Sequence, residues 1–286
     1  MERMKIAVFP NAGKRRAREI VDRIFEFYDG RNVELLMPVE DAHIFGRESH
    51  GVPDIEQAPM DMALSIGGDG TLLGVCRRLG NREVPVCGIN IGTLGFMADI
   101  ETEELEPRLE KILSGDYRLE ERILIAAYGR SGGEDRFLGN AINDAVLTRS
   151  GAARMLRMNL SVNDTHIMDC QADGIIVSSP TGSTAYSLSA GGPIMNPNIR
   201  ALLITPICAH TFHTRPLVIQ AEDVVRMKAF AAQQDITVTL DGQVSVRLMP
   251  EEEAIIRKAE TVARIVRFED RDYYQVLRAK LLARIT

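Results

Sequence analysis

The stretch MALSIGGDGTLLGVCRRL, Met62 to Leu79, joins a predicted strand to a predicted helix through a turn rich in glycine. Met62–Ile66 is a short apolar run typical of a buried strand, and Leu72–Leu79 has the spacing of an amphipathic helix. Glycines in the turn let the backbone adopt conformations closed to other residues and approach a ligand closely. The stretch therefore predicts one strand–helix unit of an α/β fold with a ligand-binding turn.

The same alternation of strands and helices continues on both sides of this unit. It indicates a mostly parallel sheet with helices packed on its faces. The further strands are predicted at Lys5–Phe9, Val33–Met37 and Val84–Ile89, and the further helices at Lys14–Tyr28 and Glu103–Leu113.

The pattern changes after Tyr117. Apolar and polar residues alternate from Leu156 to Val162, which is typical of a strand with one buried face, and Asp241-Gly242 is a hairpin signal. Helical spacing returns over Arg271–Arg284. We therefore predict an α/β domain over 1–118, with 269–286 returning to it, and a mainly β domain over 119–268. Other strands are predicted at Arg122–Tyr128, Gly174–Val177, Pro216–Ile219, Val224–Ala229, Ile236–Leu240 and Ser245–Leu248.

Composition excludes several classes of protein. The net charge of −6 argues against broad nucleic-acid binding, which needs a concentrated positive face. No apolar run approaches the roughly 20 residues of a membrane-spanning helix, and the first apolar run, of about six residues, is too short for a signal peptide. The four cysteines form no C-x-x-C pair, which favours a reducing compartment. The sequence thus predicts a cytoplasmic protein without membrane or nucleic-acid partners.

Asp69 is an unusual residue for a phosphate-binding turn because its charge repels phosphate. One explanation is that Asp69 accepts a proton from an attacking hydroxyl, and another is that it helps to hold Mg²⁺. The alternative is an ordinary tight turn in which Asp69 caps the next helix. Other nucleotide motifs, such as G-x-x-x-x-G-K-[ST], are missing from the chain.

Two further segments could contact a ligand. The glycine turn Gly88–Phe96 follows the next strand, at the edge where open α/β sheets bind ligands, although it could equally be a plain connection. The block Asp173–Pro197 is dense in Ser, Thr and Gly, and Tyr186 adds a flat apolar face. These groups suit a purine or ribose, and the alternative is a surface loop.

Four segments together resemble the NAD kinase family, in its bacterial, ATP- or polyphosphate-dependent form. They are Gly67–Thr71, Asn143–Leu147, the long Asp173–Pro193 block and the His210 to Val218 region, and they occur in the family's order. The resemblance implies a Rossmann-like N-terminal domain, a β-rich C-terminal domain and an active site in the cleft between them. The glycine turn alone also occurs in diacylglycerol and sphingosine kinases.

The resemblance also implies roles for individual residues. Asp69 would be the catalytic proton acceptor, and Asp144 replaces the Glu that is common in the family, one methylene shorter. The residues implied to bind NAD are Asp69, Gly70, Asn143, Asp144, Arg154, Gln171, Asp173, Thr184, Ala185, Tyr186, Ser187, Leu188, Ser189 and Gln243, and those implied to bind ATP phosphates are Gly67, Gly68, Gly70 and Thr71. No role follows for His210, His213 or Arg215, and no metal ligand is assigned.

The implied activity is transfer of the γ-phosphoryl of ATP to the 2′-hydroxyl of the adenosine ribose of NAD. We expect Mg²⁺ or another divalent cation as cofactor and a homodimer or homotetramer. Two alternatives remain at this stage, a lipid kinase of the diacylglycerol type and a non-catalytic NAD(P)-binding sensor. The donor range, the preference between NAD and NADH and any feedback by NADPH stay open.

Overall fold

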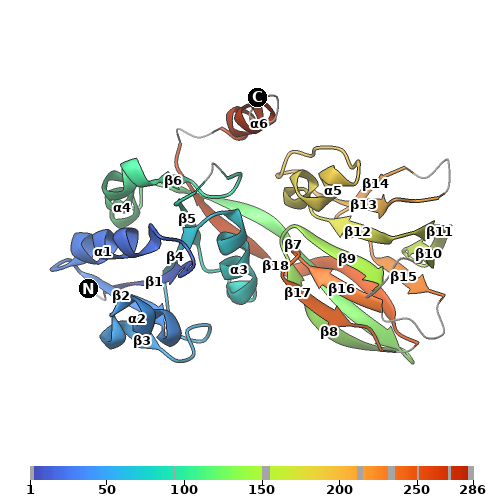
Figure 1. The fold of residues 1–286 in the computed structure, drawn as a ribbon, viewed down its shortest axis with the longest axis horizontal. Coiled ribbons are helices and arrows are strands. Elements are labelled where there is room, and N and C mark those ends of the chain that lie inside the picture. The colour runs from blue at the N-terminus through green and yellow to red at the C-terminus, as the bar shows by residue number, and fades with distance from the viewer. Residues whose placement is uncertain are drawn as a thin grey trace. The chain divides into compact units, whose positions relative to one another are not determined.

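The computed structural model describes residues 3–92, 95–149, 155–210, 215–230, 236–249, 251–269 and 272–282. The chain divides into two compact units (Figure 1). The first comprises Met1–Glu121 with Ala263–Thr286, and the second comprises Arg122–Val262. An α/β unit followed by a mainly β unit confirms the predicted fold class.

The first unit is built on a parallel sheet in the order β3-β2-β1-β4-β5. All six residues of β4 are buried, as expected for a strand covered on both faces. Helices α1 and α4 contribute to the same apolar core as strands β1, β4 and β5. The elements are β1 Met4–Pro10, α1 Ala17–Tyr28, β2 Val33–Pro38, α2 Val39–Phe45, β3 Gly51–Val52, β4 Met62–Gly67, α3 Asp69–Leu79, β5 Val86–Asn90, β6 Ile100–Glu101, α4 Leu105–Ser114 and α6 Tyr273–Leu282.

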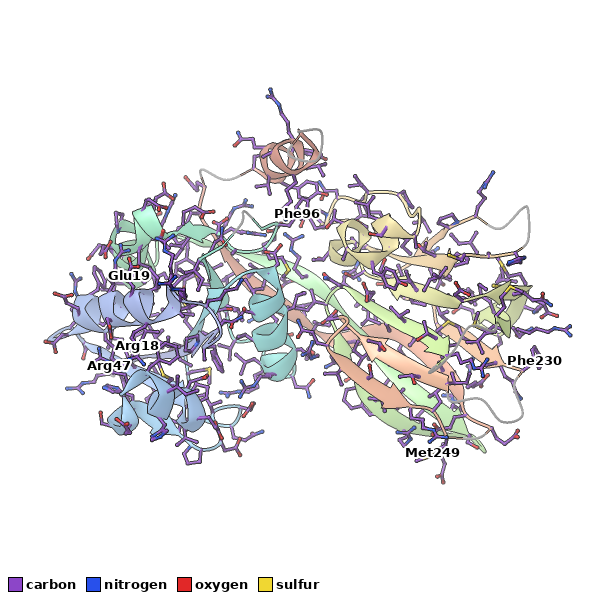
Figure 2. The ribbon with its side chains drawn as sticks, in the orientation of Figure 1. Arg18, Glu19, Arg47, Phe96, Phe230 and Met249 are labelled. Carbon is purple, nitrogen blue, oxygen red and sulfur yellow. The ribbon has the colours of Figure 1, made fainter. Side chains whose placement is uncertain are left out.

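Helix α2 was not predicted from the sequence. Arg18 of α1 donates to the carbonyl oxygens of Ile44 and Phe45 in the last turn of α2 (Figure 2). Helix α2 then ends at Gly46, which adopts the left-handed conformation. Helix α6 contacts the loop after β5, where the rings of Phe96 and Tyr273 lie 6.3 Å apart between centroids.

The second unit contains two antiparallel groups of strands around one core. One group has the order β14-β13-β12-β9-β16-β17. The other has the order β11-β10-β15-β18. Strands of both groups contribute to a single apolar cluster. The strands are β7 Arg118–Ser131, β8 Glu134–Ala141, β9 Asp144–Arg149, β10 Leu156–Val162, β11 Thr165–Ala172, β12 Gly174–Ser178, β13 Ala201–Ile207, β14 Leu217–Gln220, β15 Val225–Ala229, β16 Ile236–Leu240, β17 Val244–Arg247 and β18 Glu253–Arg267.

The alternating segment Leu156–Val162 is strand β10, with Leu156, Met158 and Leu160 buried. The hairpin predicted at Asp241-Gly242 joins β16 to β17, and both residues have positive φ. Strand β18 was not predicted, because its Ala, Glu, Arg and Lys residues are good helix formers. Its last residues return to the first unit, where Ile265 pairs with Val86 of β5.

Candidate functional site

The glycine turn of the first unit connects β4 to α3. A Cβ on Gly67 would lie 2.1 Å from Oγ1 of Thr71, so only glycine fits there, whereas a Cβ on Gly68 would meet open space. Asn11, at the end of β1, donates from Nδ2 to Oγ1 of Thr71 over 3.1 Å. The turn is thus fixed at one side and open at Gly68, and Gly70 is exposed in the first turn of the eleven-residue helix α3. Backbone N–H groups at such a helix start attract anions.

Asp69 does not cap helix α3. The helix begins at Asp69 itself, its N-cap residue is Gly68, and no side chain caps it. The carboxylate instead accepts hydrogen bonds from three consecutive backbone N–H groups of the loop after β5. The distances are 2.8 Å from Phe96, 3.1 Å from Met97 and a longer 3.4 Å from Ala98. The helix-cap alternative is therefore wrong.

The loop that binds Asp69 is itself built around it. A Cβ on Gly95 would lie 2.0 Å from Oδ1 of Asp69, so the carboxylate fits only against a glycine. The predicted glycine turn Gly88–Phe96 therefore contacts the first turn through its last residues, as its position at the same sheet edge implied. Thr93 and Leu94, within that turn, lie outside the described residues.

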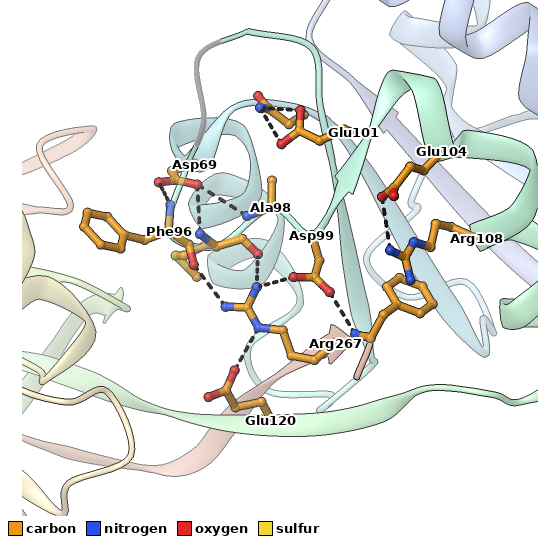
Figure 3. Close-up of polar contacts among 12 residues, drawn as sticks. Asp69, Phe96, Ala98, Asp99, Glu101, Glu104, Arg108, Glu120 and Arg267 are labelled. Atoms are coloured by element: carbon orange, nitrogen blue, oxygen red, sulfur yellow. Dashed lines mark hydrogen bonds and ion pairs between the residues drawn. The ribbon is translucent and has the colours of Figure 1, made fainter. Parts of the chain in front are cut away.

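Arg267, at the end of β18, binds the other side of this loop (Figure 3). Its guanidinium donates to the carbonyl oxygens of Phe96 and Met97 and to the carboxylates of Asp99 and Glu120. Asp99 is 1% exposed and also accepts the backbone N–H of Phe268. Sequence analysis missed these three charged residues, because no motif links an Arg to a loop some 170 residues earlier.

In the second unit, Asp241 binds the Asn143-Asp144 pair through the backbone. Its carboxylate accepts the N–H groups of Ile142 at 3.1 Å, Asn143 at 2.7 Å and Asp144 at 3.3 Å. The N–H of Asp241 donates in turn to the carbonyl oxygen of Asp144. The hairpin turn between β16 and β17 therefore fixes the start of β9, a role that its sequence did not reveal.

Asp144 is a buried acid, with 3% of its surface exposed. Burial, and secondarily the negative charge of Asp241, raise the pKa of Asp144 to about 7. In the register of β9 and β12, Asp144 lies directly opposite Ser178, so the two side chains project from the same face. Among the described residues, the buried Ser178 hydroxyl has no hydrogen-bond partner. This face thus holds a buried acid beside a hydroxyl whose hydrogen-bonding capacity is not used.

The Ser- and Thr-rich block packs closely on the Asn143 backbone. A Cβ on Gly182 would lie 2.0 Å from the Asn143 carbonyl oxygen, which accepts the Ser179 N–H. The block forms a 3₁₀ turn at Thr181–Thr184 and the short helix α5 at Tyr186–Ser189. The structure therefore brings Asn143, Asp144, the 181–189 segment and the Asp241 turn together, and the block is an ordered part of the unit.

Side chains within this segment face different environments. Tyr186 is 46% exposed, and Ser189 is also exposed. Thr184, Ala185 and Leu188 are half-buried. The Ser187 hydroxyl is fully buried and hydrogen-bonded to the hydroxyl of Thr205 at 2.7 Å. Ser187 therefore offers a ligand its backbone rather than its side chain.

Asp173 and Gln171 lie at the opposite end of β12 from Ser179. Both are exposed, and the carbonyl oxygen of Gln171 accepts the N–H of His210. Asp173 and Ser179 are six positions apart along extended chain, a span of roughly 20 Å. Gln243 is exposed in the β16–β17 turn. Arg154 and His213 lie outside the described residues.

In the described ranges, no group of three or more His, Cys, Asp and Glu side chains is placed to hold a metal ion. No described helix has the length and apolar character needed to cross a membrane.

Comparison with known families gives matches over most of the chain. Residues 7–117 match the ATP-NAD kinase N-terminal domain, and residues 142–268 match the ATP-NAD kinase C-terminal domain. Nothing in these or the following comparisons favours a lipid kinase or a non-catalytic sensor.

Individual relatives cover almost the whole length. An NAD kinase of Geobacter metallireducens is 39% identical over 280 residues, which are 97% of this chain and 98% of the relative. An NAD kinase of Moorella thermoacetica is 39% identical over 277 residues, which are 97% of this chain and 89% of the relative.

Solved structures show the same fold. An NAD kinase from Archaeoglobus fulgidus in complex with ATP has a TM-score of 0.76 and 27% identity, over 97% of this chain and 98% of that one. Yeast NADH kinase complexed with NADH has a TM-score of 0.88 and 22% identity, over 98% of this chain and 88% of that one.

Proposed function

The chain belongs to the NAD kinase family and phosphorylates the 2′-hydroxyl of the adenosine ribose of NAD with ATP, and we propose that Asp69 accepts the proton of that hydroxyl. Phosphoryl transfer asks for a positioned hydroxyl, neutralised charge around the γ-phosphate and a proton acceptor. As the 2′-oxygen bonds to the γ-phosphorus, its proton passes to Asp69, and the bond from the γ-phosphorus to the bridging oxygen breaks to release ADP.

The observation that carries this proposal is the hydrogen bonding of Asp69. A carboxylate has about four acceptor positions, two on each oxygen. Among the described residues, the N–H groups of Met97 and Ala98 use Oδ1, whereas Oδ2 accepts only from Phe96. One position on Oδ2 therefore remains for a substrate hydroxyl, on a side chain whose orientation is fixed by three backbone groups.

We propose that Gly67, Gly68, Gly70 and Thr71 form the turn that binds the phosphates of ATP. The support is the open space at Gly68, the exposure of Gly70 and the adjoining start of α3. Thr71 itself is fixed by Asn11, so the turn is preorganised for a ligand.

A divalent cation, Mg²⁺ or a substitute, is a further part of the proposal. Mg²⁺ usually keeps several waters and takes only one or two protein carboxylates besides substrate phosphates. Because the one remaining acceptor position of Asp69 is assigned to the substrate hydroxyl, water and the ATP phosphates would supply the cation's ligands in this chain of net charge −6. When bound, the cation would neutralise charge on the transferring phosphate. Full turnover in excess chelator would contradict this part.

We propose that the second unit binds NAD through two regions. Asn143, Asp144, Thr184, Ala185, Tyr186, Ser187, Leu188, Ser189 and Gln243 would bind the adenosine part, and Gln171 and Asp173 the nicotinamide part. Arg154, which lies outside the described residues, stays a predicted NAD contact with no part of the ligand assigned to it. The distance along β12 between these two sets supports this division, because a dinucleotide is an elongated ligand. The protonated form of Asp144 can donate and the ionised form can accept, so either can bind a ribose hydroxyl.

Subunit number and location complete the proposal. We expect a cytoplasmic homodimer or homotetramer. Light scattering after size-exclusion chromatography would measure the subunit number.

The test of the Asp69 proposal is an assay of NADP formation from ATP and NAD. Asp69→Asn should lower kcat at least about 10²-fold, since general-base catalysis typically contributes 10²- to 10⁴-fold. Calorimetric titration should show that NAD and ATP still bind. Asp116→Asn, a change to an exposed carboxylate paired with Lys111, is the control. If Asp69→Asn turns over within a few-fold of wild type, the acceptor lies elsewhere, with Asp144 the first candidate.

A further inference from the structure

We infer that Arg267 is a positioning residue for Asp69 and acts through the two peptide groups that lie between them. The inference rests on the proposed function of Asp69 and adds a residue that no sequence motif marks. Arg267 stands at the end of β18, at the far side of the loop from Asp69 (Figure 3).

The contacts on each peptide group are paired. In the Phe96–Met97 peptide, the carbonyl oxygen accepts from Nη2 of Arg267 at 3.1 Å, and the N–H donates to Oδ1 of Asp69 at 3.1 Å. In the Met97–Ala98 peptide, the carbonyl oxygen accepts from Nη1 at 2.9 Å, and the N–H donates to the same Oδ1 at 3.4 Å. Each peptide thus has a cation at its oxygen and an anion at its hydrogen.

This arrangement strengthens both sets of bonds. A cation at the carbonyl oxygen pulls electron density toward that oxygen, which makes the N–H of the same peptide a better donor. Hydrogen bonds to charged groups are shorter and stronger than neutral ones. Arg267 is 8% exposed, so water screens its charge little. The guanidinium therefore favours the N–H orientation that fixes the Asp69 carboxylate.

Arg267 is itself held in place by two carboxylates, one on strand β7 and one at the end of the same loop. Nε donates to Glu120 at 2.8 Å, and Nη1 also donates to Asp99 at 3.2 Å. Four acceptors around one planar guanidinium require its fork of donors, which a lysine ammonium on a flexible stem cannot reproduce. A simple ion pair with Asp99 would not require the two carbonyl contacts.

The first test compares Arg267→Lys with a variant that removes both members of the Arg267–Asp99 ion pair. Removing Arg267 alone leaves Asp99 buried without its cation and endangers folding, so the second variant is Arg267→Gln with Asp99→Asn. After Asp99→Asn, the side-chain amide oxygen can still accept the N–H of Phe268. In both variants we expect kcat to fall about 10- to 100-fold, with KM for NAD within about two-fold, because misplacing a catalytic group costs rate on this scale.

The control is Arg264→Gln, three residues earlier on the same strand. Arg264 is 37% exposed and pairs with Glu83, so kcat should stay at the wild-type value. Circular dichroism and thermal unfolding check that every variant is folded. If the folded double variant keeps wild-type kcat, or if KM alone rises, the inference is overturned.

A double-mutant cycle separates this inference from the proposal for Asp69. If Arg267 acts through Asp69, adding Arg267→Lys to Asp69→Asn should lower kcat by less than about two-fold further, because the effects of coupled residues are not additive. Additive losses would overturn the inference. If Asp69→Asn alone stays active, the function proposed for Asp69 fails whatever the Arg267 variants do. If Asp69→Asn is inactive and Arg267→Lys fully active, only the inference fails.

Discussion

Asp69 in the first unit and Asp241 in the second use their carboxylates in the same way and differ in what the contact fixes. Each accepts hydrogen bonds from three consecutive backbone N–H groups, of residues 96–98 for Asp69 and 142–144 for Asp241. In the first case the carboxylate is the proposed reacting group and the loop holds it. In the second, the loop carries Asn143 and Asp144, and the carboxylate holds the loop.

The difference teaches where a substitution should act. Disturbing the contacts of Asp69 moves a group proposed to take part in the chemical step, so kcat should respond. Disturbing the contacts of Asp241 moves residues proposed to bind NAD equally in the ground state and the transition state, so KM should respond. The following predictions test this contrast.

Gly95→Ala should give the largest effect. The added Cβ would lie 2.0 Å from Oδ1 of Asp69, so the carboxylate must move while its chemistry is unchanged. We expect kcat to fall about 10²-fold, the loss typical of a misplacement near 1 Å. The NADP assay at saturating NAD and ATP measures it.

Gly182→Ala is the matched variant in the second unit, because its Cβ would lie 2.0 Å from the Asn143 carbonyl oxygen. It should raise KM for NAD and leave kcat within a few-fold. Similar losses of kcat in both variants would break the contrast.

Asp144→Asn should change how stability depends on pH. The pKa of Asp144 is raised to about 7 in the fold, against an ordinary value near 3.9 in the unfolded chain. Between these values the unfolded state has lost the proton and the folded state keeps it, so wild-type stability falls as pH rises from about 4 to 7.

The asparagine variant has no titrating carboxyl at position 144 and so lacks this dependence of stability on pH. From pH 5 to pH 8 the wild type should therefore lose about 1–3 kcal/mol of unfolding free energy relative to Asp144→Asn. Urea denaturation at the two pH values measures the difference. Parallel behaviour of the two proteins would show that the carboxyl of Asp144 is ionised throughout.

Asp241→Asn should raise KM for NAD about 10-fold, or about 1.4 kcal/mol, with kcat within a few-fold. An amide has one acceptor oxygen where the carboxylate has two, so the N–H groups of 142–144 lose part of their binding. Asp169→Asn, at an exposed carboxylate on β11, is the control. A loss confined to kcat would place Asp241 in the chemical step.

Ser187→Ala should have the smallest effect on catalysis. The Ser187 hydroxyl bonds to Thr205 in a fully buried site, so its loss should cost about 1 kcal/mol of stability. KM for NAD should change by less than about two-fold. A large rise in KM would show that this hydroxyl turns toward the substrate.

Local periodicity explains what could be predicted. The parallel strands and β10 were recognisable because buried positions recur at short, regular spacing. Strand β18 was not, because its helix-forming residues become a strand through pairing with the distant strands β15, β5 and β7. The domain limits predicted at 118 and 268 stay a prediction.

The residues of the candidate site likewise divide into those that the sequence marks and those that it does not. Asp69, Asn143 and Asp144 stand in segments that a resemblance can mark. The partners of Asp69 are 27 to 29 residues away, and Arg267 is about 170 residues from the loop it binds. Hydrogen bonds to backbone N–H and C=O groups place no demand on side-chain identity, so one sequence carries no trace of them.

The late position of Arg267 also sets the order in which a ribosome can complete the site. The loop that holds Asp69 is synthesised 170 residues before Arg267, an interval of about 10–35 s at ordinary translation rates. Until β18 emerges, the first unit lacks Arg267 and one of the strands that pair with β5. A nascent or prematurely terminated chain therefore lacks the contacts that Arg267 makes to this loop, so we expect the full rate of NAD phosphorylation only after β18 has left the ribosome.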